Sequence, residues 1–164
     1  MNGAYLATAG RIHQELIELD RVVERVGQIW SLRQHEDLPP EPEYLDFLVD
    51  AVALNLHGVY AGIERILELV AGTVDQSKPS GALWHRDLLQ QMTAEIPGVR
   101  PPVLSLEAKN SLDRYRGFRH VVRNIYTFSL DIEQVELLVE HLPEVYQHTR
   151  AELTQFANFL EQIA

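Results

Sequence analysis

Apolar residues recur at three- and four-residue steps along most of this chain, which is the spacing of one face of a helix. Such stretches cover residues 6–34, 43–71, 83–95, 105–128 and 132–163. No segment has the strict apolar–polar alternation of a half-buried strand. The pattern predicts an all-α fold, an antiparallel bundle of about five helices, with residues 1–164 forming one domain.

Proline and glycine mark the predicted breaks between these helices. Residues 35–42 contain three prolines and end the first helix, because proline cannot continue a helix. Residues 72–81 form a loop, and residues 96–104 form a second break that we expect to be extended. Ser105 is the expected N-cap of the fourth helix, and Ser129 or Asp131 caps the last one.

Three small or cyclic residues stand inside predicted helices. Gly58 and Gly62 lie four apart in the second helix, where each costs roughly 1 kcal/mol relative to alanine. We therefore expect them to mark close packing between helices. Pro143 is expected to kink the last helix or to divide it in two.

The composition bears on whether the chain binds nucleic acid or a membrane. The 164 residues carry a formal net charge of -10, and cysteine is absent. An acidic chain is poorly suited to broad nucleic-acid binding, although a local basic site remains possible. Without a signal-peptide pattern or an apolar run of about 20 residues, the expectation is a cytoplasmic protein without a membrane segment.

The strongest candidate for a site lies in residues 114–126, which hold four of the 14 lysines and arginines. On a helix of about 100° per residue, valines, isoleucine and phenylalanine occupy one side of this segment. The other side carries Arg116, Arg119, His120, Arg123, Asn124 and Tyr126. Such a cluster of cations, imidazole, amide and phenol suits a phosphate, and RNA is the first ligand to consider.

Each of these residues also has a structural interpretation. The arginines could be paired with some of the 24 acidic residues, which would relieve their mutual repulsion. His120 could be a hydrogen-bonded structural histidine or a neutral imidazole that acts as a general base. Tyr126 could pack at the surface, or it could be a nucleophile or a modification site.

Several common kinds of site are missing from the sequence. His57, His85, His141 and His148 are not accompanied by carboxylates at metal-ligand spacing, so we expect no metal and no cofactor. There is also no glycine-rich phosphate loop, no serine elbow and no cysteine nucleophile.

Residues 118–126, FRHVVRNIY, late in an all-α chain, resemble the HEPN superfamily and more closely its HepT-like branch. The resemblance extends over most of the chain. It includes residues 54–65, LNLHGVYAGIER, residues 79–89, PSGALWHRDLL, and residues 96–101, IPGVRP.

The resemblance implies a metal-independent endoribonuclease whose motif is an arginine, four to six residues, a histidine, any residue and a tyrosine. Two subunits would bring their motifs together across a homodimer interface. Such proteins are often toxins, silenced by a nucleotidyltransferase antitoxin that transfers AMP to the motif tyrosine. Arg119 takes the arginine position of this motif and Tyr126 takes the tyrosine position.

The histidine position of the motif falls on Asn124. An amide can hydrogen-bond a phosphate or a 2′-hydroxyl, but it cannot exchange a proton near neutral pH. Loss of a general acid or base typically costs about 10²–10⁴ in rate. Either the chain is a weak or inactive nuclease, or His120, one turn earlier, replaces the missing histidine.

Three hypotheses therefore remain. In the first, the chain is a HepT-like endoribonuclease toxin, in which Arg119 stabilises the transition state and His120, with Asn124, handles the 2′-hydroxyl. Arg116 and Arg123 would then hold the RNA backbone. In the second, a catalytically degenerate HEPN module binds a nucleotide or a nucleotidyltransferase. In the third, the chain is a structural adaptor whose arginines are paired internally.

Overall fold

The structure, a computed structural model, describes residues 2–34, 41–124, 126 and 129–164. Five α-helices and one short 3-10 helix occur in these residues, and the strand-like element among them is an isolated bridge between Ile96 and Arg100. The all-α prediction is confirmed. The elements are α1 (Gly3–Ser31), η1 (Leu32–Gln34), α2 (Pro42–Thr73), α3 (Trp84–Met92), α4 (Leu106–Asn124) and α5 (Ile132–Ile163).

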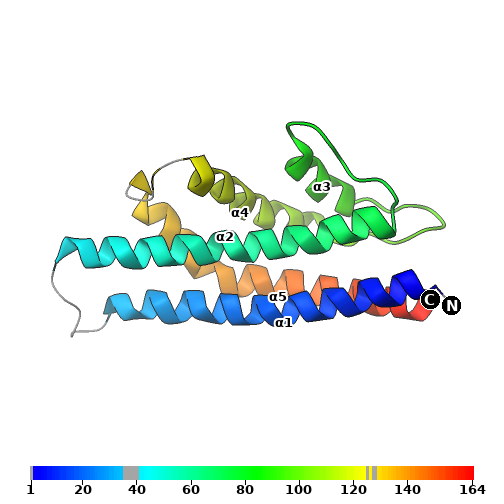
Figure 1. Cartoon of the computed structure of the whole chain (residues 1–164), viewed down its shortest axis with the longest axis horizontal. Coiled ribbons are helices and arrows are strands. Elements are labelled where there is room, and N and C mark those ends of the chain that lie inside the picture. The colour runs from blue at the N-terminus through cyan, green and yellow to red at the C-terminus, as the bar shows by residue number, and fades with distance from the viewer. Residues whose placement is uncertain (1, 35–40, 125, 127–128) are drawn as a thin grey trace.

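Three long helices, α1, α2 and α5, form the frame of the bundle, and α1 packs against both others (Figure 1). The chain reverses direction between α1 and α2, so these two helices are antiparallel. Helix α4 packs on α2 and α5, and the short α3 packs on α2 and α4. The chain ends meet, since the backbone N–H of Asn2 donates to the carbonyl of Ala164 at 2.5 Å. The frame thus presents α3 and α4 together on one side of α2.

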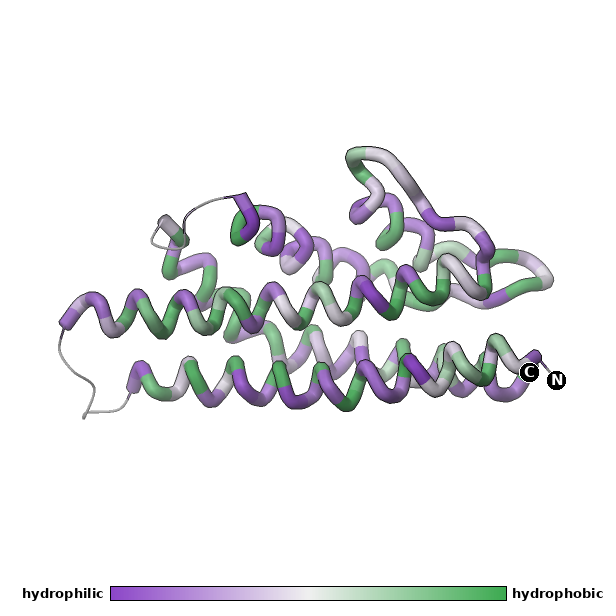
Figure 2. Tube along the Cα trace, viewed as in Figure 1, coloured by the Kyte–Doolittle hydropathy of each residue, from purple (hydrophilic) through white to green (hydrophobic). Residues whose placement is uncertain are grey.

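Each long helix buries one side, and Figure 2 shows the resulting alternation of hydrophobic and hydrophilic residues along it. The buried positions of α1 include Ile12, Leu16, Leu19 and Val26, as the periodicity predicts. Burial of one such side chain stabilises the fold by about 1.5–3 kcal/mol. None of the described helices is long and apolar enough to cross a membrane.

The helix boundaries follow local chemistry. Ser105 caps α4, because its Oγ accepts from the N–H of Ala108 at 3.1 Å. Asp131 caps α5 by accepting from the N–H of Glu133 at 3.0 Å. Both predicted caps are confirmed. The predicted break at 35–42 and the predicted end of the fourth helix at Phe128 lie largely or wholly outside the described residues.

Gly62 marks a close approach of α1 and α2. A Cβ atom placed on Gly62 would lie 2.5 Å from Leu19 Cδ2 and 3.2 Å from Glu15 Oε1. At Gly58 the nearest such atom, Val22 Cγ1, is 3.9 Å away, which is ordinary contact. The prediction of close packing is therefore correct for Gly62 and not for Gly58.

Two sequence predictions about breaks need correction. Helix α5 continues through Pro143 as one helix from Ile132 to Ile163, so it is not divided. Proline removes one backbone donor, and the packing on both sides of Pro143 holds the helix together. Residues 96–104 are not simply extended, because Ile96 and Arg100 exchange backbone hydrogen bonds of 2.9 and 3.0 Å across a tight turn. Gly98 permits that turn with a φ of 74°.

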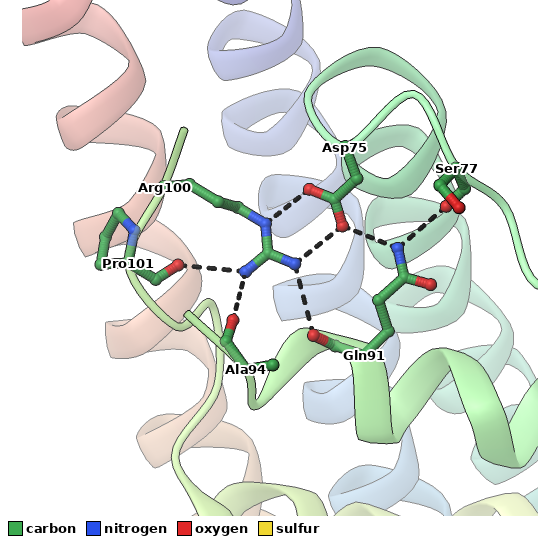
Figure 3. Close-up of polar contacts among 6 residues, drawn as sticks. All are labelled: Asp75, Ser77, Gln91, Ala94, Arg100 and Pro101. Atoms are coloured by element: carbon green, nitrogen blue, oxygen red, sulfur yellow. Dashed lines mark hydrogen bonds and ion pairs between the residues drawn. The ribbon is translucent and has the colours of Figure 1, made fainter. Parts of the chain in front are cut away.

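A buried ion pair fastens this turn to the ends of α2 and α3 (Figure 3). The Arg100 side chain is 0% exposed and the Asp75 side chain 1%. Arg100 donates to both Asp75 oxygens, at 2.5 and 2.7 Å, and also to the carbonyls of Gln91, Ala94 and Pro101. The Gln91 amide donates to Asp75 and to the Ser77 carbonyl. We call these residues the Arg100 cluster, and it fixes α3 against α2.

Candidate functional site

Helix α4 presents the basic residues because its other side is buried. Ala108, Leu112, Tyr115 and Phe118 form the buried row. The Tyr115 hydroxyl donates to the Leu138 carbonyl of α5 at 2.7 Å, and this bond fixes the rotation of α4 about its own axis. Of the apolar residues expected at the end of this helix, Val121 and Val122 are half-buried, whereas Ile125 and Phe128 lie outside the described residues.

The basic residues of α4 face a hollow that also borders α3. Its volume is about 520 Å³, and five of its lining residues are Arg116, Arg119, His120, Arg123 and Asn124. The remaining lining residues come from the start of α3 and the turn before it: Ala82, Leu83, His85 and Arg86. We call this space the basic hollow. The structure brings the predicted cluster together and adds a histidine and an arginine from α3.

A buried carboxylate of α2 lies at the base of this arrangement. The Glu64 side chain is 4% exposed. Its Oε2 accepts from His85 Nδ1 at 2.6 Å, and its Oε1 lies 3.6 Å from Arg119 Nη2. Three helices thus contribute to one charged group, which we call the Glu64 triad: Glu64, His85 and Arg119. A carboxylate is costly to bury without such partners.

The guanidinium of Arg119 lies over the ring of His85. Arg119 Nη1 is 3.4 Å from both ring nitrogens of His85. An atom in the ring plane at equal distances from both nitrogens would overlap the carbon between them, so Nη1 must lie above the ring. The neighbouring Trp84 also stacks on His85, with ring centroids 3.6 Å apart. The orientation of the His85 ring is therefore fixed by Glu64, Arg119 and Trp84.

Arg119, the predicted motif arginine, is 16% exposed at its side chain. Its Nε is buried without a hydrogen-bond partner among the described residues. Arg116 is paired with Asp113 of its own helix at 2.7 Å, and this hydrogen bond raises the pKa of Arg116. The predicted catalytic arginine, Arg119, and one of the two predicted phosphate-binding arginines, Arg116, are thus already in contact with carboxylates.

The remaining motif residues are exposed. His120, Arg123 and Asn124 lie at the surface of the last helical turns. The Asn124 amide donates to the His120 carbonyl at 2.6 Å, and its nitrogen is 3.4 Å from His120 Nδ1. Tyr126 is 77% exposed and lies two residues beyond the end of α4. The site therefore combines paired arginines on one side with exposed polar groups on the other.

The pKa of His57 on α2 responds to the charges of this region. Burial lowers the pKa of His57, and the nearby cations Arg119 and Arg123 lower it further, against an opposing effect of Glu64. The net influence of the neighbouring charges is therefore positive, although the whole chain is acidic. A positive local potential is suited to an anion.

Sequence reasoning missed Glu64 and His85 as members of the site. Glu64 was detectable, because it interrupts the apolar row of Tyr60, Ile63 and Leu67 on the second helix. A carboxylate at such a position requires a buried partner. His85 gave no comparable signal, since it stands on a short helix whose placement depends on the Arg100 cluster. Among the described residues, no three histidine, aspartate or glutamate side chains gather as a possible metal site.

Comparison with known families identifies the relationship of the chain. The family model described as HepT-like protein matches residues 51–160, which is most of the chain. The chain belongs to the HepT-like family. The predicted resemblance to HepT-like HEPN proteins is thus confirmed at the level of the family. No curated protein and no solved structure matches this HepT-like chain.

The match places the whole candidate site within the HepT-like part of the chain. Residues 51–160 include Glu64 on α2, all of α3 and α4, and most of α5. Helix α1 lies outside the matched residues. The chemistry-bearing side chains of this HepT-like protein therefore come from the part of the chain that the family shares.

Proposed function

We propose that this chain is a HepT-like endoribonuclease that cleaves RNA without a metal ion in the basic hollow. The observation that carries the proposal is the gathering of four arginines around one hollow in a chain with a net charge of -10. Those arginines are Arg86, Arg116, Arg119 and Arg123. Arginine offers planar pairs of donors that match phosphate oxygens.

Within this proposal, Arg119 stabilises the negative charge that develops on the phosphorus oxygens during cleavage. Its contact with Glu64 at 3.6 Å holds the guanidinium next to the basic hollow, which Arg119 lines. Arg116 and Arg123 hold the RNA backbone on either side. His120, with Asn124 one turn away, handles the 2′-hydroxyl, and the 3.4 Å contact between their side chains supports a joint role.

The first test is incubation of the purified protein with total RNA, with and without a chelator. We expect cleavage that survives the chelator and falls by at least about 10²-fold in Arg119→Ala, because a preorganised charge-stabilising donor is removed. Arg25→Ala is the matched control, since Arg25 is an exposed cation of α1 far from the hollow in sequence and does not line it. Equal cleavage by Arg119→Ala and the unsubstituted protein would indicate a contaminating nuclease and contradict the proposal.

A second candidate function is favoured by Asn124, which cannot exchange a proton, and by the existing contact of Arg119 with Glu64. In that case the chain is a catalytically degenerate HEPN module that binds a nucleotide or a nucleotidyltransferase. Retention of RNA or nucleotide binding in the basic hollow, together with no cleavage by the unsubstituted protein, would favour this second function.

The toxin role further requires a homodimer and an antitoxin. A homodimer is supported by the open surface of α4, because a Cβ atom on Gly117 would meet nothing within 4 Å. A groove of about 700 Å³ between α4 and α5, bordered by the exposed Leu137, offers apolar surface for a second copy. We infer that a second copy packs on this groove, and light scattering of the purified protein would test the dimer through its mass.

Tyr126 is the proposed site of AMP transfer by a nucleotidyltransferase antitoxin. Its 77% exposure makes the hydroxyl accessible to another protein, and its place beyond α4 lies next to the basic hollow in sequence. Co-expression with a nucleotidyltransferase from the same genome should add one adenylyl group, seen by mass spectrometry. Tyr126→Phe should gain none, whereas modification of that variant at another residue would reject this assignment.

A further inference from the structure

The Glu64 triad determines which ring nitrogen of His85 can exchange a proton with another molecule. A carboxylate can only accept a hydrogen bond, so the 2.6 Å contact with Glu64 makes His85 Nδ1 a donor. The second nitrogen, Nε2, is therefore the one that can exchange a proton with another molecule. This is the relation in which a buried carboxylate orients an imidazole and stabilises its charged form.

Nε2 of His85 remains available on the side of the basic hollow. Arg119 Nη1 lies over the ring face, as its equal distances of 3.4 Å require, and so does not occupy the in-plane direction of Nε2. No other hydrogen bond to Nε2 is formed in the described part of the chain. His85 lines the hollow together with Arg119 and His120, and its side chain is 26% exposed.

We propose that His85 is the general acid of RNA cleavage in this chain, with Glu64 as its positioning residue. The inference rests on the proposed endoribonuclease function and adds the proton-transfer group that Asn124 does not supply. His85 comes from α3, outside the motif of α4, and a sequence motif confined to α4 therefore would not include it.

Two histidines account for the two proton transfers that the cleavage reaction requires. His120 accepts the proton of the 2′-hydroxyl, and the 2′-oxygen forms a bond to phosphorus. The bond from phosphorus to the 5′-oxygen breaks, and protonated His85 gives its Nε2 proton to that oxygen. The products are a 2′,3′-cyclic phosphate and a free 5′-hydroxyl, and both rings return to their starting state by exchange with water.

The charges around His85 suit this role. Glu64 stabilises the imidazolium through a charge-assisted hydrogen bond, while burial keeps the carboxylate from turning towards water. Arg119, close to the same ring, opposes that charge until a phosphate enters the hollow. A phosphate bound to Arg119 would offset the positive charge of the guanidinium next to the His85 ring.

The test compares two substrates that differ in their leaving group. An RNA oligonucleotide has a 5′-alkoxide leaving group that needs a proton, whereas uridine 3′-(4-nitrophenyl phosphate) has a phenolate that does not. We expect His85→Ala to cleave RNA about 10²–10⁴-fold more slowly and to cleave the nitrophenyl ester at close to the normal rate. His120→Ala should be slow on both, because its proposed proton comes from the 2′-hydroxyl of either substrate.

Matched variants separate chemistry from folding. Glu64→Gln keeps an acceptor for Nδ1 but removes the charge, so it should slow RNA cleavage and spare the nitrophenyl ester. His13→Ala removes a half-buried histidine of α1 that lines neither the basic hollow nor the groove between α4 and α5, and it should change neither rate. Binding of a 2′-deoxy-substituted, uncleavable oligonucleotide should be unchanged in His85→Ala, which shows that the hollow is intact.

Each outcome decides one question. If His85→Ala is equally slow on both substrates, or unaffected on both, the acid role of His85 is overturned while RNA cleavage itself stands. If the unsubstituted protein cleaves neither substrate, both the proposed endoribonuclease function and the acid role of His85 are contradicted. A loss on RNA alone, with binding retained, supports His85 as the acid.

Discussion

Replacing Arg100 with methionine is expected to lower the free energy of unfolding by about 3–5 kcal/mol. The substitution leaves Asp75, 1% exposed, as a buried charge that keeps only the hydrogen bond from Gln91. It also removes the donor of the hydrogen bonds to the carbonyls of Ala94 and Pro101. Urea unfolding followed by circular dichroism would measure the loss.

Two controls distinguish the loss of a buried ion pair from the loss of an exposed one and from the loss of both partners. Arg21→Met breaks an exposed pair with Glu18, whose side chains are 72% and 59% exposed, and should change stability by no more than about 0.5 kcal/mol. Replacing both partners, with Asp75→Leu and Arg100→Met together, should recover part of the loss, because no charge is then left without a partner. A loss under about 1 kcal/mol in Arg100→Met alone would mean that the Arg100 cluster does not hold α3.

Removing His85 and Arg119 together is expected to destabilise the chain by more than the sum of the two single changes. Either residue alone still leaves Glu64 one partner, since Oε2 contacts His85 and Oε1 lies near Arg119. With both replaced by alanine, the carboxylate is buried at 4% exposure and has no other side-chain hydrogen bond or ion pair among the described residues. The excess should be about 0.5–3 kcal/mol, the range seen for groups that share a partner.

A double-mutant cycle would measure this coupling through the stabilities of the four proteins. The comparison cycle combines Arg119→Ala with His141→Ala, which share no partner and should be additive within about 0.5 kcal/mol. Additivity in the first cycle would show that Glu64 does not depend on the other two residues. It would also remove the physical basis for treating the Glu64 triad as one unit.

Local features of the fold were predictable because they depend on residues near one another in sequence. The spacing of Ile12, Leu16 and Leu19 indicates a buried helix face. Ser105 and Asp131 indicate helix N-termini, because their side-chain oxygens can accept from the first backbone N–H groups. Of the two alternatives predicted at Pro143, a divided helix was wrong, because tertiary packing on both sides of the proline outweighs the loss of one backbone donor.

The site was predictable only on one helix. The spacing of Arg116, Arg119 and Arg123 fixes their common side of α4, and the structure brings all three to one hollow. The partners of Arg119 were not predictable, because Glu64 and His85 are 55 and 34 residues away along the chain. Which residues meet across helices depends on the rotation and offset of each helix, and periodicity does not determine these.

Helix α1 forms one side of the frame, yet it contributes no residue to the basic hollow and lies outside the family match. In the proposed function α1 supports α2, through the close contact of residues such as Leu19 with Gly62. Selection on the buried side of α1 should therefore act on side-chain size, whereas exposed residues of α1 that contact no other helix can diverge between relatives. Exposed residues of α1 could accordingly be substituted for labelling or immobilisation without changing the residues that line the basic hollow.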